Sequence, residues 1–202
     1  MSIINDIVAT IMLTKVLGRL LHNVRAGNNY SVWNRAQLQA PTSIHIGSSA
    51  FGEGTAIPLR HAGVGVGMNI SPALHWSGIP GNAKQLLLII EDTDVPLPRP
   101  LIHTIALIDA RLDGLDENGL ARATTEVTFV PASFGRIGYA GPRPISGHGV
   151  HHYGFYLYAL DKAIDPSKPP KSLGKTLQLL CGHVIARGGL IGTCERTCIP
   201  AH

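Results

Sequence analysis

The stretch that most restricts the fold of this chain is Gln85–Pro96, QLLLIIEDTDVP. Its five consecutive apolar residues, 86–90, are enough for a strand but too few for a typical helix. The run does not alternate with polar residues, which is typical of a strand covered on both faces. Pro96 cannot donate to a neighbouring strand, so the strand has ended by this point. The stretch therefore predicts a central, buried β-strand.

Three carboxylates, Glu91, Asp92 and Asp94, follow the apolar run. Because side chains alternate along a strand, Asp92 and Asp94 are predicted to point to the same side. Two acids that point together from the end of a buried strand are typical of a functional site. Aspartates are also common in the turns that follow ordinary strands. The stretch alone leaves both interpretations open.

The remainder of the sequence agrees with a β-fold. Only 15% of the 202 residues are charged, whereas 23 are glycine and 14 proline, which favours short strands joined by turns. From residue 42 onward, short apolar segments alternate with clusters of Gly, Pro, Asn and Asp, as in a sandwich or barrel. The segments predicted as strands are 44–46, 56–59, 74–76, 86–90, 102–108, 127–130, 153–160 and 183–191. Residues 173–180 predict one short helix.

The first part of the chain has a different pattern. Apolar residues recur there at helical spacing, at Ile4, Ile7, Val8, Ile11, Leu17, Leu20, Leu21 and Val24. This spacing predicts an amphipathic helix over residues 3–24, whose apolar face must be covered. We expect it to pack on the domain or on a second subunit, which would make a homodimer; adsorption to a membrane surface is the less favoured alternative. Residues 1–40 are therefore predicted to be a helical extension and residues 41–202 the main domain.

Charge and hydropathy restrict the partners and the compartment. The net charge of +4 is mildly basic, and no block of Lys and Arg indicates nucleic-acid binding. Lys15 and Arg19 interrupt the N-terminal apolar stretch, so it predicts neither a secretory signal nor a transmembrane segment. We therefore expect a cytoplasmic protein.

The three cysteines, Cys181, Cys194 and Cys198, are odd in number. We expect free thiols in a reducing compartment, with a Cys194–Cys198 disulfide as the alternative. Their spacing does not complete a zinc site, and the histidines show no HxH or HExxH pattern. No metal and no cofactor are therefore predicted.

Histidine and tyrosine side chains are further candidates for a site. His103 opens a predicted strand, and His151 and Tyr153 alternate along another, so these last two share a face. A carboxylate beside a histidine raises the pKa of the imidazole and fixes its tautomer. Such a pair can donate to an anion or act as a general acid and base. If these residues converge with Asp92 and Asp94, they form such a site. Taken alone, each of them can also be an ordinary polar residue at the end of a strand.

Trp76 is a further candidate. It is either a wall of a pocket or a residue of the hydrophobic core.

Six ordered segments carry a resemblance to a known family. They are SPALHWSGIP (71–80), LLLIIEDTDVP (86–96), HTIALID (103–109), FGRIGYAGPRP (134–144), GVHHYGFYLYALD (149–161) and GHVIARGGLIGT (182–193). Over residues 42–196 the chain resembles the phosphatidylethanolamine-binding protein (PEBP) family, in particular its microbial, Raf-kinase-inhibitor-like branch. The resemblance implies a sandwich of two antiparallel sheets with a few flanking helices. It also implies a small pocket for phosphate, acetate or a phosphorylated headgroup.

The resemblance assigns the pocket to particular residues. It implies that ligands are bound by Asp92, Asp94, His103, His151, Tyr153 and the loop 141–144, which contains Gly141 and Arg143. The chain has Leu101 and Ile102 where relatives commonly have aromatic residues, and Arg143 where they often have a small or neutral one. These departures predict a wider, less aromatic and more basic pocket mouth.

Three hypotheses for function follow. The leading one is a protein that binds a small phosphorylated or carboxylated molecule, with Trp76 as an additional pocket residue. The second is an enzyme in which Asp92, His103 and His151 catalyse the isomerisation, dehydration or cyclisation of a metabolite. The third is an inhibitor of a kinase or protease that acts through surface loops at residues 141–148.

Overall fold

The computed structural model describes residues 12–196. It consists mainly of two antiparallel sheets, which confirms the predicted fold class. The larger sheet has the strand order β6-β4-β3-β7-β8 and the smaller one β1-β2-β5. The strands are β1 (His45–Ser48), β2 (Leu74–Ser77), β3 (Gln85–Asp92), β4 (Leu101–Asp109), β5 (Gly114–Leu115), β6 (Val127–Phe129), β7 (Val150–Leu160) and β8 (Val184–Glu195).

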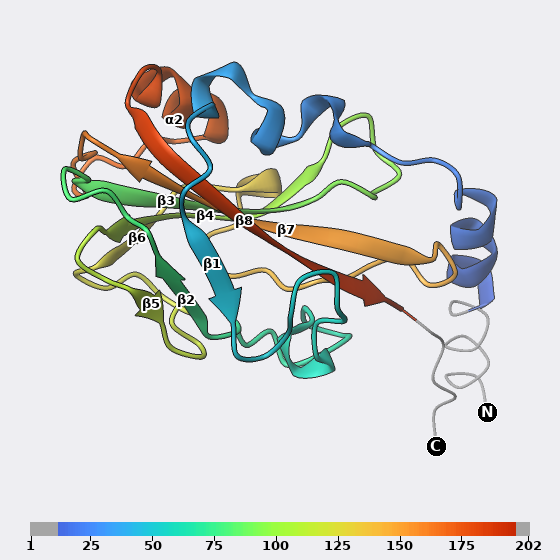
Figure 1. Cartoon of the computed structure of the whole chain (residues 1–202). Coiled ribbons are helices and arrows are strands. Elements are labelled where there is room, and N and C mark those ends of the chain that lie inside the picture. Colours follow the sequence, from blue (N-terminus) through green and yellow to red (C-terminus); the bar gives the residue numbers. More distant parts are fainter. Residues whose placement is uncertain (1–11, 197–202) are drawn as a thin grey trace.

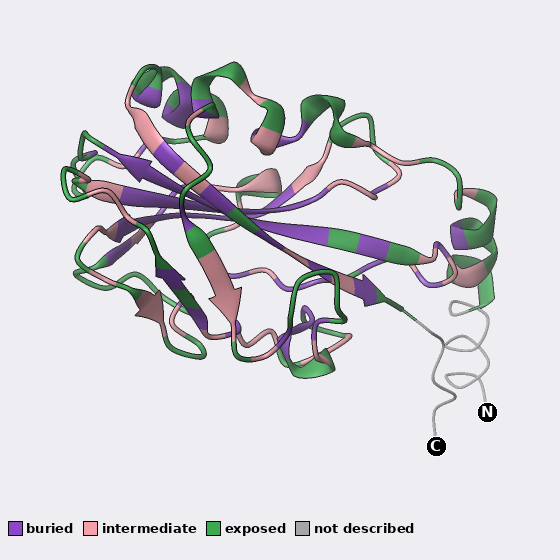
Figure 2. Cartoon of the chain, viewed as in Figure 1, coloured by how far each residue is buried: buried purple, intermediate pink, exposed green. Residues whose placement is uncertain are grey.

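Strand β3 lies at the centre of the larger sheet and is buried on both faces, as predicted (Figure 2). Leu88 and Ile90 face the smaller sheet and pack in the core between the sheets. Leu87 and Ile89 point the other way, into a second core. Because alternate residues face opposite sides of a strand, a strand covered on both sides must be apolar at every position.

The second core is closed by helical segments on the outer face of the larger sheet (Figure 1). They are α2 (Leu173–Leu180), at the predicted position, and three 3-10 turns, η1 (Asn28–Tyr30), η2 (Val32–Asn34) and η3 (Ala36–Leu38). Val32 and Leu38 are fully buried there, so this part of the predicted extension packs against the main domain. Glu91 accepts hydrogen bonds from the Ser31 hydroxyl and the Val32 backbone N–H, and burial raises its pKa. Glu91 therefore anchors this segment and takes no part in the site.

Two other predictions of elements are corrected. Residues 56–59 form no strand: Ala56 makes one isolated bridge to Thr193, and Leu59 begins the 3-10 turn η4 (Leu59–His61). Strand β5 was not predicted, because two residues are too few to show a pattern. Cys181 and Cys194 are free thiols, and Cys198 lies outside the described residues.

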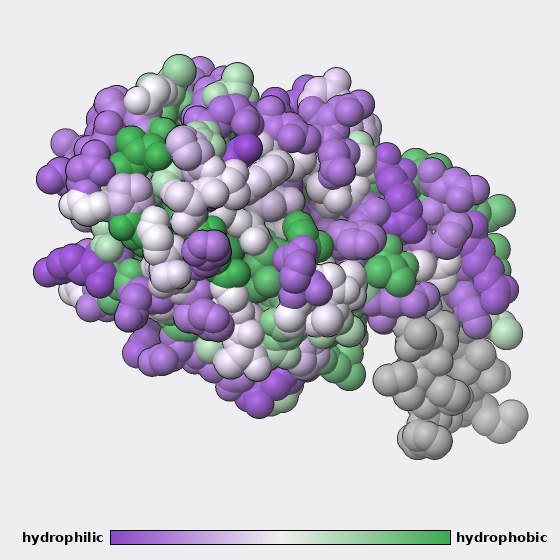
Figure 3. Space-filling model, viewed as in Figure 1, coloured by the Kyte–Doolittle hydropathy of each residue, from purple (hydrophilic) through white to green (hydrophobic). Residues whose placement is uncertain are grey.

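An N-terminal helix is present over residues 12–20; residues 1–11 of the predicted helix lie outside the described part. Gly18 faces the domain so closely that a Cβ atom there would lie 2.1 Å from the Ser146 carbonyl oxygen. The apolar side chains point away from the domain and are exposed: Met12, Leu13, Val16, Leu17, Leu20 and Val24. Hydrophobic surface accordingly lies along the outer edge of this helix (Figure 3). The domain thus leaves most of the described part of the apolar stripe uncovered, with Leu21 half-buried. Within residues 12–196 no helix has the length and apolar character needed to cross a bilayer.

Candidate functional site

A cavity of about 410 Å³ lies where β3 ends and β4 and β7 begin. It is lined by Thr14, Asp92, Val95, Pro96, Leu97, Leu101, His103, Arg136, Arg143, Pro144, Ile145, Ser146, His151 and Arg196. The antiparallel register places these strand termini at one edge of the sheet, with Asp92 opposite both Leu101 and Tyr153. Of the predicted residues, the structure brings Asp92, His103, Arg143 and His151 together here.

Asp92 and His151 form a buried pair. His151 Nδ1 lies 2.7 Å from Asp92 Oδ2, and both side chains are almost fully buried. As alternation predicted, His151 and Tyr153 share one face of β7, where their rings stack, whereas His152 points to the other side. Of the two, only His151 is among the residues that line the cavity. A buried acid–imidazole pair is retained only with close hydrogen bonding, because isolated charges are costly to bury.

His148, which the sequence analysis did not select, extends this pair into a relay. Its Nδ1 lies 2.7 Å from His151 Nε2, and its Nε2 lies 2.8 Å from the Leu21 carbonyl oxygen. A carbonyl oxygen only accepts, so His148 carries its proton on Nε2 and, when neutral, accepts at Nδ1. His151 then donates from Nε2, and a further proton is shared between its Nδ1 and Asp92.

The shared proton makes His151 and Asp92 either an imidazolium and a carboxylate or a neutral imidazole and a neutral carboxylic acid. With a neutral His148, the relay has no net charge in either case. Burial, followed by the neighbouring His151, lowers the pKa of His148, which favours His148 as the neutral member. The sequence contained a weak signal for this residue in the spacing GHGVHH, residues 147–152, but nothing showed that the loop turns inward.

His103 enters the cavity through a β-bulge. In the β3–β4 register, Thr104 pairs with Ile90 and Ile102 with Glu91, so His103 is the extra residue. A bulge redirects the side chains beside it. Both His103 and Thr104 therefore reach Ala140: His103 Nδ1 donates to its carbonyl oxygen at 2.9 Å, and the Ala140 N–H donates to Thr104 Oγ1 at 3.4 Å.

The other ring nitrogen of His103, Nε2, is buried and has no hydrogen-bond partner among the described residues. Burial lowers the pKa of His103, an effect that the charge of Asp92 opposes and those of Arg136 and His151 reinforce. The neutral ring thus keeps an unused lone pair beside the cavity. Tyr153 lies behind it, with ring centroids 5.3 Å apart, and burial raises its pKa so that the hydroxyl stays protonated.

Three arginines from separate segments line the same cavity: Arg136, Arg143 and Arg196. Asp92 is the one carboxylate among the described lining residues, and it is paired with His151. The cavity wall is therefore electropositive, in agreement with the more basic mouth predicted from Arg143.

The prediction that Asp94 points the same way as Asp92 is wrong. Strand β3 ends at Asp92, whose Oδ1 accepts the Asp94 backbone N–H at 2.8 Å in a turn. The carboxylate of Asp94 instead binds Arg25 at 2.7 Å and His152 Nδ1 at 2.8 Å, beside a second hollow. Although burial acts to raise the pKa of Asp94, these hydrogen bonds outweigh it and lower the pKa.

Gly141 and Trp76 do not line the cavity either. The Gly141 N–H donates to Asn69 Oδ1 at 2.8 Å, and an added Cβ would lie 2.2 Å from the His61 carbonyl oxygen, so close backbone packing requires glycine. Trp76 lies in the core between the sheets and donates from Nε1 to the Leu112 carbonyl oxygen at 2.7 Å. In residues 12–196 no group of three or more His, Cys, Asp or Glu side chains is placed to hold a metal ion.

The fold and this cavity define a class: antiparallel two-sheet sandwiches with an acid- and histidine-lined cavity at the strand ends. The family model described as phosphatidylethanolamine-binding protein matches residues 47–195, and the chain belongs to this family. A UPF0098 protein of Pyrococcus horikoshii is 37% identical over 155 residues, which cover 74% of this chain and 75% of that protein.

Two solved structures are similar as well. A PEBP homologue from Chlamydia trachomatis is 32% identical with a TM-score of 0.68, over 77% of this chain and 99% of that one. Escherichia coli YbcL, described as a new member of the mammalian PEBP family, is 25% identical with a TM-score of 0.70 over the same shares. The match to the family model begins at residue 47, so the segment before it lies outside the matched part.

Proposed function

We propose that this protein binds a small phosphorylated or carboxylated anion in the cavity, a class that includes phospholipid headgroups. The observation that carries the proposal is the buried Nε2 of His103, which has no partner among residues 12–196. His103 lines the cavity together with Arg136, Arg143 and Arg196. A buried polar atom without a partner costs free energy, which a bound ligand recovers.

The chemistry of His103 determines how an anion binds. Its Nδ1 already donates to Ala140, so Nε2 can donate to an anion only after the ring takes up a proton. The resulting imidazolium forms a charge-assisted hydrogen bond, and an arginine guanidinium adds a bidentate one. Anion binding is therefore expected to be coupled to proton uptake.

Sulfate, which stays a dianion at neutral and mildly acidic pH, tests this coupling. Since burial lowers the pKa of His103 in the free protein, the His103 ring is neutral at pH 7 when the site is empty, and binding must add a proton to it. We expect sulfate affinity to rise by up to about tenfold for each pH unit by which the pH falls towards the lowered pKa of His103. Below that pKa the affinity should level off. Calorimetry in buffers of different ionisation enthalpy should register uptake of up to about one proton per sulfate. Affinity independent of pH would contradict the proposal.

An enzyme that uses the same residues is the second candidate, because a neutral His103 with a free Nε2 is also the form required of a general base. Turnover of a bound metabolite, lost when His103 is replaced while the fold is retained, would favour it. The third hypothesis, an inhibitor acting through loops 141–148, stays a prediction.

We also propose that the exposed face of the N-terminal helix forms a homodimer. The exposed apolar side chains are those of Met12, Leu13, Val16, Leu17, Leu20 and Val24. If they are buried against their copies in a second subunit, accessible surface on the order of 1,000 Å² is removed from water, which is near the lower limit for a specific interface. Native mass spectrometry should show that the wild-type protein is a dimer. The side chain of Leu20 is 77% exposed, and the variant Leu20→Lys should be a monomer. Met68→Lys, at a 69% exposed residue elsewhere, should leave the dimer intact. A wild-type monomer would refute the proposal.

A further inference from the structure

Residues 21–27, which we call the N-terminal strap, are tied to the site through His148. The Nε2–H of His148 points at the Leu21 carbonyl oxygen at 2.8 Å and the Val24 carbonyl oxygen at 3.2 Å. The other side of the same ring accepts the proton from His151 Nε2. One fully buried imidazole thus joins the strap directly to a histidine that lines the cavity.

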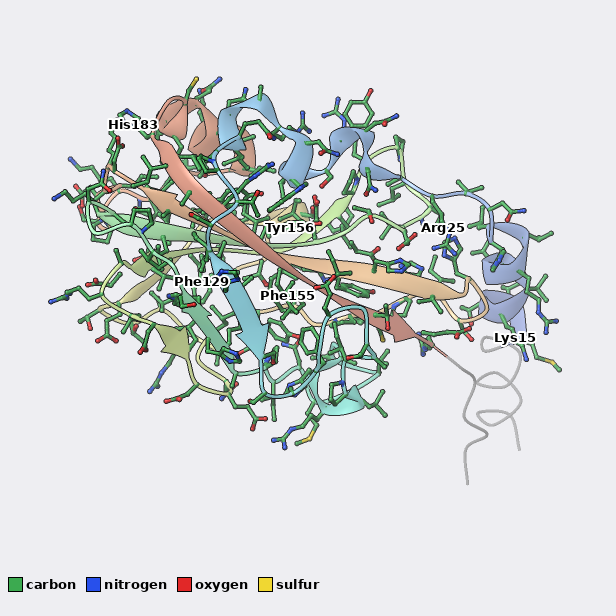
Figure 4. The ribbon with its side chains drawn as sticks, viewed as in Figure 1. Lys15, Arg25, Phe129, Phe155, Tyr156 and His183 are labelled. Atoms are coloured by element: carbon green, nitrogen blue, oxygen red, sulfur yellow. The ribbon has the colours of Figure 1, made fainter. Side chains whose placement is uncertain are left out.

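Arg25 and two backbone amides fasten the same strap outside the cavity. Arg25 Nη1 donates to Asp94 Oδ1 at 2.7 Å and to the Val150 carbonyl oxygen at 2.9 Å. The N–H groups of Ala26 and Gly27 donate to the backbone carbonyls of Val95 and Thr93, each at 2.9 Å. Figure 4 shows Arg25 between the N-terminal helix and the beginning of β7. The strap lies outside the segment that the family model matches, so this fastening is an addition to the matched domain.

The fastened strap and a bound anion require the same proton. His151, which lines the cavity, has one N–H that is not directed at Asp92, on Nε2, and His148 accepts it in the structure. An anion that receives this N–H leaves His148 Nδ1 without its donor, and a buried acceptor without a donor is costly. To relieve this, the His148 ring must turn or move its proton from Nε2 to Nδ1, and either change removes the N–H that donates to the Leu21 and Val24 carbonyl oxygens.

We propose that the strap is a latch on the ligand site, and that its closure competes with anion binding at His151. The inference rests on the proposed function, because the competing ligand is the anion proposed there. It makes His148 a positioning residue, which acts on the ligand through His151. It also gives the N-terminal extension a role in setting affinity.

Substitution of Arg25 tests the latch at a distance, because this side chain lines the second hollow and not the cavity. In the full-length protein, Arg25→Gln should raise sulfate affinity about tenfold, a typical coupling between two sites. The direction is diagnostic, since loss of a positive charge by itself weakens attraction of an anion. His148→Asn should raise sulfate affinity by a similar factor. The double variant, Arg25→Gln with His148→Asn, should raise it no further, because both substitutions release the same strap and their effects are therefore not additive. Arg60→Gln is the matched control: it removes an exposed arginine–carboxylate pair, with Glu117, at neither cavity.

Hydrogen exchange provides a readout that does not depend on affinity. Saturating sulfate should speed amide exchange at Ala26 and Gly27 in the wild-type protein about tenfold. Unchanged sulfate affinity in Arg25→Gln, or slower exchange at these amides with sulfate, would overturn the latch. If neither the wild-type protein nor His148→Asn binds sulfate, the proposed function is wrong. Exchange in ligand-free His148→Asn tests separately whether His148 fastens the strap: faster exchange at Ala26 and Gly27 is expected, and unchanged exchange overturns the latch whether or not sulfate binds.

Discussion

Replacement of His103 by leucine is expected to lower the affinity for sulfate about 100-fold while the protein stays folded. Removing one partner of a buried charge-assisted hydrogen bond typically costs 2–5 kcal/mol of binding free energy, and about 2.7 kcal/mol corresponds to this factor. The substitution should also abolish the rise in affinity at lower pH, because the group that takes up the proton is gone. Calorimetric titration of both proteins across the pH range measures both effects.

His61→Leu provides a matched control for this experiment. His61 is also a buried histidine, with Nδ1 2.8 Å from the carbonyl oxygen of Ile70, but it does not line the cavity. Its replacement should change stability without changing sulfate affinity. Equal loss of affinity in the two variants would indicate a general loss of structure, and unchanged affinity in His103→Leu would exclude His103 from the site.

Replacement of Asp92 by asparagine is expected to destabilise the fold by about 3 kcal/mol, although the side chain keeps its shape. Where Asp92 and His151 are present as carboxylate and imidazolium, removal of the carboxylate leaves a buried charge without compensation, which typically costs about 3–5 kcal/mol. The side chain of His151 is 1% exposed. The relay through His148 also loses its only carboxylate. Urea denaturation monitored by circular dichroism gives the free energy of unfolding for both proteins.

Asp161→Asn is the control for the effect of burial. Asp161 also pairs with a histidine, His183 (labelled in Figure 4), at 2.9 Å, but both side chains are more than a third exposed. Solvent screens such pairs, so this variant should unfold at nearly the wild-type urea concentration. If Asp92→Asn were no less stable than Asp161→Asn, Asp92 and His151 would not form a buried charged pair.

The sequence predicted most of the elements because local patterns determine them. The unbroken apolar run of β3 occurs where a strand is covered on both faces, and α2 follows from its helical spacing. The pairing of Asp92 with His151 was predicted as a hypothesis, since alternation fixes which strand residues share a face. The six motif segments predicted the family, and the family match confirmed it.

Alternation failed wherever regular strand geometry ended. It placed Asp94 beside Asp92, but β3 stops at Asp92 and the Asx turn reverses the direction of the following side chain. It gave no reason to set His103 apart from its neighbours, yet the bulge against β3 directs His103 into the cavity. Bulges and turns depend on how two strands are matched in register, which the sequence of one strand does not contain.

By itself, the sequence determined the sandwich, the central strand, the family and the core of an acid–histidine site, because these depend on spacing within segments. Only the tertiary structure decided which way His103, Asp94 and His148 face, since their directions depend on contacts between distant segments. The tertiary structure also decided that, within the described part of the N-terminal helix, apolar side chains such as Leu20 are exposed while Gly18 faces the domain. Helical spacing predicts an apolar face, but only packing determines what covers it.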